Sequence, residues 1–309
     1  MAEELASSGH LLGQLIGDWW ERYVLLPMLQ AIAIELDMFA DNRYIKRTCR
    51  GDKIHWKDYD GNVVDYDFVL EINGTTAQKG TPVAFMESFW RRGARHSKDK
   101  ARDDTNKLLP MRETYPSARF LAIAASGEFT EPARDYVKSL GVALFFVPKS
   151  KIVEAFALAG FNIDYSDRAT ERTKNEIARI FQEKLDTEQA SFVALKLREI
   201  VGEGAFTGFI HTVVSSLSAQ PVEIEIRQAT LSESAVFQNI VDASQFLLDP
   251  TFEHKGTEAG YTYKVTYSDG SEFYRDVATL KALQHLNGQL LELLNHMDAV
   301  SKKIRLRAK

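Results

Sequence analysis

The stretch of residues 63–147 limits the fold most strongly, because short apolar runs alternate there with polar, helix-like segments. Residues 63–72 alternate apolar and polar side chains, and they follow Asp60-Gly61, a pair typical of tight turns between strands. Residues 82–86 form an almost continuous apolar run, as expected for a strand covered on both faces. We therefore expect a hairpin that leads into the central strand of a sheet.

The segments around this hairpin predict an α/β fold. Residues 97–115 and 132–140 have helical patterns, and the apolar runs 118–125 and 141–147 alternate with them as strands. A strand–helix–strand order favours parallel pairing through a right-handed crossover. Residues 10–40 are predicted to be a leading helix that Pro27 kinks or splits in two. The predicted fold class is α/β, with a mixed central sheet flanked by helices.

The second half of the chain has a different character and is predicted to be an α+β region. Two helices are expected within residues 168–201, a strand at 221–229 and a hairpin within 261–277. Leucines at steps of three and four residues between 283 and 300 predict a helix that packs lengthwise on a neighbour or on a second copy. We place a domain boundary at residue 160, giving domains 1–160 and 161–309, and expect the basic tail 301–309 to be mobile.

Composition indicates a soluble protein inside the cell. Hydrophobic residues make up 45% of the chain and charged residues 26%, and Cys49 is the single cysteine, which argues against disulfides and a cysteine-based zinc site. The first ten residues lack the pattern of a signal peptide, and the apolar tract 19–38 is too polar to span a bilayer. We expect a cytoplasmic protein without a membrane partner. Its net charge of −5 is compatible with a local basic patch.

Two acids and a group of cations form the main chemical signal. Asp67 alternates with apolar residues on a mostly buried strand, and Glu87 ends the predicted central strand. Buried like charges are costly unless a cation neutralises them. Between residues 91 and 102, Asp99 alone opposes six cations, which are Arg91, Arg92, Arg95, Lys98, Lys100 and Arg102. This combination is typical of a divalent-metal site that acts on phosphate. The alternative explanation of the same residues is a strand with one solvent-exposed face, followed by a helix whose charged side chains are solvated.

Other common enzyme chemistries have little support in the sequence. The GEGAFTG segment at residues 202–208 has the wrong spacing for a nucleotide-binding loop and follows a predicted helix. The sequence contains no P-loop, no HExxH motif and no Gly-x-Ser-x-Gly elbow. Metal-assisted chemistry at the two acids therefore remains the leading hypothesis.

VVDYDFVL followed by VAFMES resembles the core of the PD-(D/E)XK nuclease superfamily, the fold of many restriction endonucleases. The predicted order of elements over residues 10–150 is also similar to that family. The resemblance implies a restriction-endonuclease-like fold and Mg²⁺-dependent hydrolysis of DNA phosphodiester bonds, with Mn²⁺ as a substitute. It also implies that Asp67 and Glu87 bind the metal, with the main-chain carbonyl of Ser88 as a further ligand.

Glu21 is a further candidate ligand on the leading helix. Gly13, Gly17 and Glu21 are four residues apart and share one helical face. Some members of the family add an acid from this helix, and Glu21 matches it. The alternative is a glycine-lined packing face beside a solvated glutamate.

Phe89 departs from the family motif, because it occupies the position of a lysine that helps to activate water. Either Lys98 or Lys100 of the following helix supplies that amine, or the site is inactive. Lysine suits this role better than Arg91, because arginine stays protonated.

The predicted function is that of a DNA endonuclease of restriction-endonuclease type. Phosphate contacts are predicted for Arg91, Arg92, Arg95 and Arg102. Two cuts in a duplex are most simply made by a homodimer. The alternatives are an inactive nuclease-fold protein that binds DNA or serves in an assembly, and an α/β protein without a nucleic-acid partner.

Overall fold

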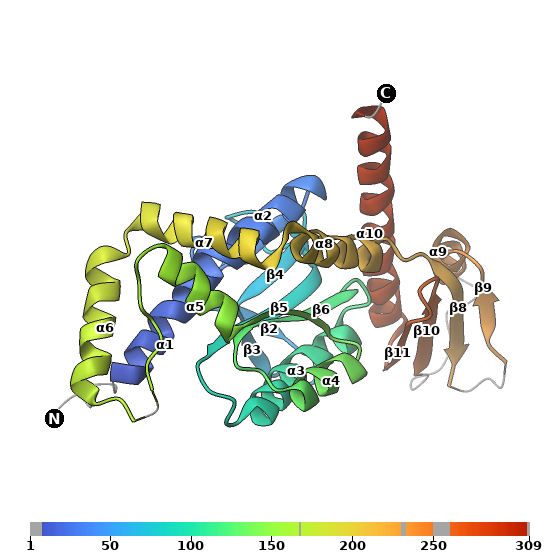
Figure 1. The fold of residues 1–309 in the computed structure, drawn as a ribbon. Coiled ribbons are helices and arrows are strands. Elements are labelled where there is room, and N and C mark those ends of the chain that lie inside the picture. Colours follow the sequence, from blue (N-terminus) through green and yellow to red (C-terminus); the bar gives the residue numbers. More distant parts are fainter. Residues whose placement is uncertain (1–7, 167, 230–232, 250–259, 308–309) are drawn as a thin grey trace. The chain divides into compact units, whose positions relative to one another are not determined.

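The structure is a computed structural model, and it describes residues 8–166, 168–229, 233–249 and 260–307 (Figure 1). The chain forms two compact units, each built from three stretches. Unit 1 consists of Met1–Ile32, Met86–Thr105 and Ala122–His211; unit 2 consists of Ala33–Phe85, Asn106–Leu121 and Thr212–Lys309. The single boundary at residue 160 stays a prediction. The first seven residues, which we expected not to begin a signal peptide, lie outside the described residues.

The leading helical segment is confirmed, but its irregularity lies before Pro27. The helix α1 (Ser8–Trp19) continues into a π-helical turn, η1 (Trp20–Leu25), and then into α2 (Leu26–Glu35). Pro27 is therefore at the start of α2, where a missing N–H is tolerated. The predicted extension to residue 40 is wrong, because Asp37 takes a left-handed φ of 54° and a strand, β1 (Phe39–Asn42), follows.

A mixed five-stranded sheet has the strand order β1-β4-β5-β6-β7, so the predicted α/β class is confirmed at this level. β1 is antiparallel to β4, whereas β6 and β7 are parallel. All eight residues of β6 are buried, as expected for an interior strand. The strands and the helices between them are β4 (Phe68–Ile72), β5 (Thr81–Arg91), α3 (Ser97–Thr114), β6 (Phe120–Gly127), α4 (Glu131–Ser139) and β7 (Ala143–Pro148).

The strand predicted at residues 63–72 is interrupted at Asp67. Its first part, β3 (Val63–Tyr66), pairs with β2 (Ile54–Lys57) in a separate two-stranded hairpin. The Asp65 side chain accepts a hydrogen bond from the backbone N–H of Ile54 at 2.9 Å and so closes the hairpin. Only the second part, β4, enters the five-stranded sheet. Asp67 consequently lies at the junction of the two strands.

After β7, four consecutive helices lie wholly or mainly in unit 1. They are α5 (Lys149–Leu158), α6 (Glu171–Lys184), α7 (Thr187–Val201) and α8 (Glu203–Ser218). The two helices expected within residues 168–201 are confirmed, while α8 was not predicted. Gly202 separates α7 from α8 with a φ of 92°, a conformation that favours glycine. Among the described residues no single helix is long and apolar enough to cross a bilayer; α7 and α8, bent by 90°, reach that length and composition only as a pair.

The C-terminal part of unit 2 contains a four-stranded sheet in the order β11-β10-β8-β9. The predicted hairpin is confirmed as β10 and β11, and the leucine-rich segment forms one long helix, α10. Leu283, Leu286 and Leu290 pack against the side chains of this sheet, so the apolar seam has an intramolecular partner. The helix α10 extends to Arg307, and the last two residues of the tail that we expected to be mobile lie outside the described residues. The elements are β8 (Pro221–Gln228), β9 (Ala235–Phe237), α9 (Ile240–Leu248), β10 (Tyr261–Tyr267), β11 (Glu272–Val277) and α10 (Leu280–Arg307).

Candidate active site

Glu87 lies inside strand β5 and is only 2% exposed. The sequence predicted that the strand ends at this residue, but β5 continues to Arg91. Two contacts hold the additional length: Ser126 Oγ donates to the Phe89 carbonyl at 3.1 Å, and the Glu128 N–H donates to the Arg91 carbonyl at 2.7 Å. A carboxylate inside a strand, rather than at its end, has its direction fixed by the strand.

Glu87 shares a face of β5 with Phe89, because side chains two residues apart in a strand point to the same side. The Phe89 ring meets Phe129 edge-on, with the ring centres 5.1 Å apart. The Lys100 ammonium of α3 lies 5.3 Å from the centre of the Phe89 ring. The structure therefore brings a lysine from α3 to the side of β5 on which Glu87 lies.

The opposite face of β5 is the one that α1 covers. A methyl group added at Gly17 would lie 3.9 Å from Trp90 Cβ, so this helix packs closely against the even-numbered side of the strand. Ser88 shares that side with Trp90. Glu21, which is 8% exposed, lies one turn beyond Gly17 in the π-helical turn. The role of Glu21 as a metal ligand stays a prediction.

The π-helical turn that carries Glu21 is anchored by two tryptophans. Trp19 Nε1 donates to the Ala190 carbonyl at 3.0 Å, and Trp20 Nε1 donates to the Ala124 carbonyl at 3.2 Å. Single π-helical turns are rare and occur often at functional sites. These two hydrogen bonds hold the backbone around Glu21 in place within unit 1. The close contact of Gly17 with Trp90 agrees with the alternative of a glycine-lined packing face.

Asp104 is a residue of this region that the sequence analysis missed. Its Oδ1 lies 2.6 Å from Lys100 Nζ, one helical turn earlier in α3, and its side chain is 1% exposed. A buried carboxylate at this distance orients the ammonium. The spacing of four residues between a lysine and an aspartate within a predicted helix is the signal that would have found it.

Lys98 and Arg102 lie on a different side of α3. Both are exposed, and with Pro132 and Tyr136 they line a shallow hollow of about 160 Å³. Of the two lysines predicted as substitutes for the motif lysine, the structure places only Lys100 beside Phe89.

Three of the predicted phosphate-binding arginines follow Glu87 at the end of β5 and in the next loop. Arg95 is exposed, whereas Arg91 and Arg92 are half-buried. The Arg92 guanidinium donates to the Tyr165 carbonyl and lies 3.9 Å from the centre of the Tyr165 ring. Arg92 is therefore held in one direction, which lowers the entropy that it loses on binding an anion.

Asp67 belongs to unit 2 and is partly exposed at the junction of β3 and β4. No group of three or more His, Cys, Asp or Glu side chains in the described part of the chain is arranged to hold a metal ion. Mg²⁺ is commonly bound by one or two carboxylates together with water and substrate phosphate. The predicted donors, two carboxylates and the Ser88 carbonyl, are hard oxygen ligands of the type that Mg²⁺ prefers.

Unit 2 contains a buried ionic cluster that the sequence analysis did not identify. Arg47 Nη1 lies 2.5 Å from Asp41 Oδ2 and 2.6 Å from Glu71 Oε1, and the side chains of all three are fully buried. Arg50 pairs with Asp41 at 2.7 Å. Burial alone would lower the pKa of Arg47, but its hydrogen bonds to Glu71 and Asp41 raise that pKa above its ordinary value. The negative charges of the two acids equal the positive charges of the two arginines. We therefore interpret this cluster as a structural tie, meaning a group of ion pairs that stabilises the fold.

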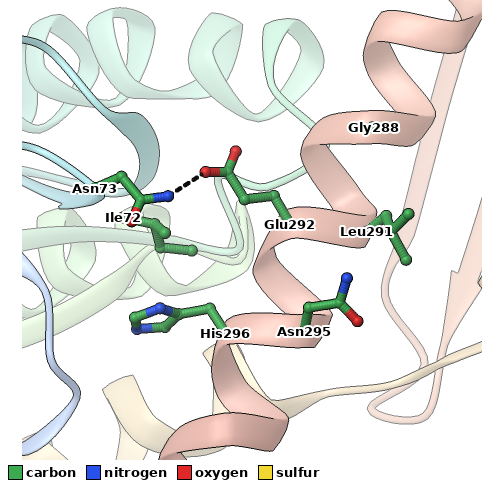
Figure 2. Close-up of a pocket in the computed structure, with 7 residues that line it drawn as sticks. All are labelled: Ile72, Asn73, Gly288, Leu291, Glu292, Asn295 and His296. Atoms are coloured by element: carbon green, nitrogen blue, oxygen red, sulfur yellow. Dashed lines mark hydrogen bonds between the residues drawn. The ribbon is translucent and has the colours of Figure 1, made fainter.

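A hollow of about 480 Å³ lies between α10 and the end of β4, within unit 2 (Figure 2). Glu292 reaches across it: its Oε1 accepts from Asn73 Nδ2 at 2.7 Å, and its Oε2 accepts from Thr81 Oγ1 at 2.5 Å. His296, one turn further along α10, contacts the Leu36 carbonyl through Nε2 at 2.7 Å. The two Glu292 contacts attach the segment between β4 and β5 to α10, and the His296 contact attaches the residue that follows α2.

Comparisons with known proteins add no functional information. No protein-family model matches the sequence, and a search of curated proteins gives no match. One solved structure, described as a protein of unknown function AF1548, aligns with 62% of this chain and 99% of its own length, at 11% identity and a TM-score of 0.26. That similarity is too low to indicate a shared fold.

Proposed function

We propose that the protein is a Mg²⁺-dependent DNA endonuclease with a restriction-endonuclease-like arrangement of its five-stranded sheet. The observation that supports this function best is the position of Lys100, whose ammonium lies 5.3 Å from the ring of Phe89. Phe89 occupies the position of the motif lysine, on the same face of β5 as Glu87. An amine supplied by α3 at this place would replace the one that the strand lacks.

The candidate site residues of unit 1 have separate roles in this proposal. Lys100 would orient the attacking water and offset the negative charge that develops on the phosphate. Asp104 would position Lys100 through the 2.6 Å ion pair. Arg91, Arg92, Arg95 and Arg102 would contact the flanking phosphates and supply affinity without sequence selectivity.

The metal would be held by the carboxylates of Asp67 and Glu87 and by the carbonyl of Ser88. When bound, Mg²⁺ lowers the pKa of a water ligand and stabilises the charged phosphate. Asp67 enters this set from the sequence motif alone. Glu21 stays a prediction of the motif as a further ligand.

Cleavage of supercoiled plasmid in Mg²⁺ or Mn²⁺ tests the proposal. Glu87→Gln and Asp67→Asn should each reduce cleavage by about 100-fold or more, as the loss of a metal ligand does, and EDTA should abolish it. Glu128→Gln is the matched control, because Glu128 is exposed at the end of β6. Full activity in both acid variants, with native circular dichroism, would refute the enzyme.

A second candidate function is a DNA-binding or assembly protein without turnover, which Phe89 itself favours. Binding of duplex DNA that weakens with salt, without cleavage in any divalent metal, would support this alternative. For an active enzyme, paired cuts in a duplex point to a homodimer, and an intracellular location gives access to DNA.

A further inference from the structure

A hollow of about 540 Å³ in unit 1 lies beside the C-terminal end of β5. One wall is the N-terminal part of α1, which contributes His10, Gly13 and Gln14. The other wall is the end of the strand, with Trp90, Arg91 and Arg92. Polar and cationic groups thus converge on a space that the helix leaves open.

Open space lies beside Gly13. A Cβ atom built on Gly13 would meet nothing within 4 Å, so the glycine has no packing partner to accommodate. Glycine in a helix costs about 1 kcal/mol relative to alanine. No packing partner accounts for this cost, so a side chain introduced at position 13 would face the open space.

A buried donor lies in the same wall. Trp90 Nε1 is buried, and no acceptor among the described residues accepts its hydrogen bond. A buried polar group without a partner costs about 1–3 kcal/mol. An oxygen acceptor bound in the hollow would remove that cost.

The charges around the hollow select an anion. Arg92 is held in place by Tyr165, and its neighbour Arg91 adds a second positive charge. The adjacent acid, Asp164, is already paired with Lys149 at 2.7 Å. The lining residues include no carboxylate, so the charge that faces the space is positive.

We propose that this hollow binds the phosphodiester backbone of one DNA strand. Phosphate oxygens would accept from Arg91, Arg92 and Trp90, and position 13 of α1 would face the bound strand across the open space. This inference rests on the proposed nuclease function and extends its DNA contacts from the end of β5 to the first helix.

The test uses fluorescence anisotropy with a labelled 20-base-pair duplex in EDTA, so that binding is measured without cleavage. Gly13→Arg should tighten binding about threefold to tenfold and steepen the salt dependence by about one phosphate contact. Gly13→Glu should weaken binding about tenfold by repulsion. The matched controls are Gly208→Arg and Gly208→Glu, because Gly208 is also helical, exposed and open.

The outcomes separate this inference from the function on which it rests. If the wild-type chain binds and cleaves DNA and the Gly13 and Gly208 pairs shift affinity equally, the hollow is not the binding site and the nuclease function stands. If the wild-type chain does not bind the duplex, both proposals fail. Opposite shifts at Gly13 alone support the hollow, including in a Glu87→Gln background that does not cleave.

Discussion

The ammonium of Lys100 and the ring of Phe89 form a cation–π contact, with 5.3 Å between the nitrogen and the ring centre. The contact links the residue that breaks the nuclease motif to a lysine eleven positions later in the chain. Since Asp104 also pairs with this ammonium, two contacts hold Lys100 on the face of β5 that carries Glu87. If the catalytic amine is supplied by the helix and not by the strand, returning a lysine to the strand position should compensate for its loss from the helix.

Lys100→Met should reduce plasmid cleavage by about 100-fold or more, in the range expected for a missing acid–base or electrostatic group. Phe89→Lys introduced into Lys100→Met should restore part of the activity, because the new amine would start from the strand position that the motif uses. Initial cleavage rates in Mg²⁺ measure both effects.

Lys98→Met is the control for this exchange, because Lys98 lies beside α4 rather than beside Phe89. It should leave the rate nearly unchanged. Equal losses in Lys98→Met and Lys100→Met, or no rescue by Phe89→Lys in a protein that melts normally, would exclude the migrated lysine.

Arg47→Met should destabilise the protein by about 3–5 kcal/mol, because it leaves two buried carboxylates, Asp41 and Glu71, without their shared cation. Urea unfolding followed by circular dichroism measures the loss. Arg179→Met is the matched control, since Arg179 forms ion pairs with Glu176 and Glu183 on an exposed helix surface. The control should unfold close to the wild-type midpoint; a similar small effect at Arg47 would show that the buried cluster is not a structural tie.

Tyr267 predicts how stability falls in alkali. Burial raises its pKa from 10.0 to about 12, although the neighbouring Arg119 opposes the shift. The folded state therefore keeps a proton that the unfolded state loses above pH 10, so stability is intact below pH 10 and falls between pH 10 and 12. The slope is at most about 1.4 kcal/mol per pH unit for this residue.

Tyr267→Phe should make that decline shallower, with the buried Tyr263 still contributing. At neutral pH the variant should lose about 0.5–1.5 kcal/mol, because the Tyr267 hydroxyl donates to the Pro116 carbonyl at 3.2 Å. Urea titrations at pH 8, 10 and 11 measure both the pH slope of the unfolding free energy and the loss of stability near neutral pH. Identical pH slopes for the two proteins would contradict the assignment.

Local sequence patterns were sufficient to predict most of the helices and strands. Alternation and turn residues predicted the hairpin before Asp67 and the buried strand of Glu87, because each signal lies within about ten residues. The break at Asp67 could not be predicted, since it depends on β3 pairing with β2 while β4 pairs with β1. Alternation of apolar and polar residues predicts that a segment is a strand, but it does not determine with which other strand that segment pairs.

The candidate site was predictable only where charge and position coincide. The sequence named Lys98 and Lys100 together, and only tertiary packing distinguishes the lysine beside Phe89 from the one beside α4. Arg47 illustrates the same limit, because its two carboxylate partners come from β1 and β4 and no local spacing connects them.

The hydrogen bond from Asn73 to Glu292 joins residues 219 positions apart. During synthesis on a ribosome, the loop between β4 and β5 is complete long before its clamp on α10 has been translated. The order of translation therefore leaves this turn without its contact to α10 until Glu292, 219 positions later, has been added to the chain.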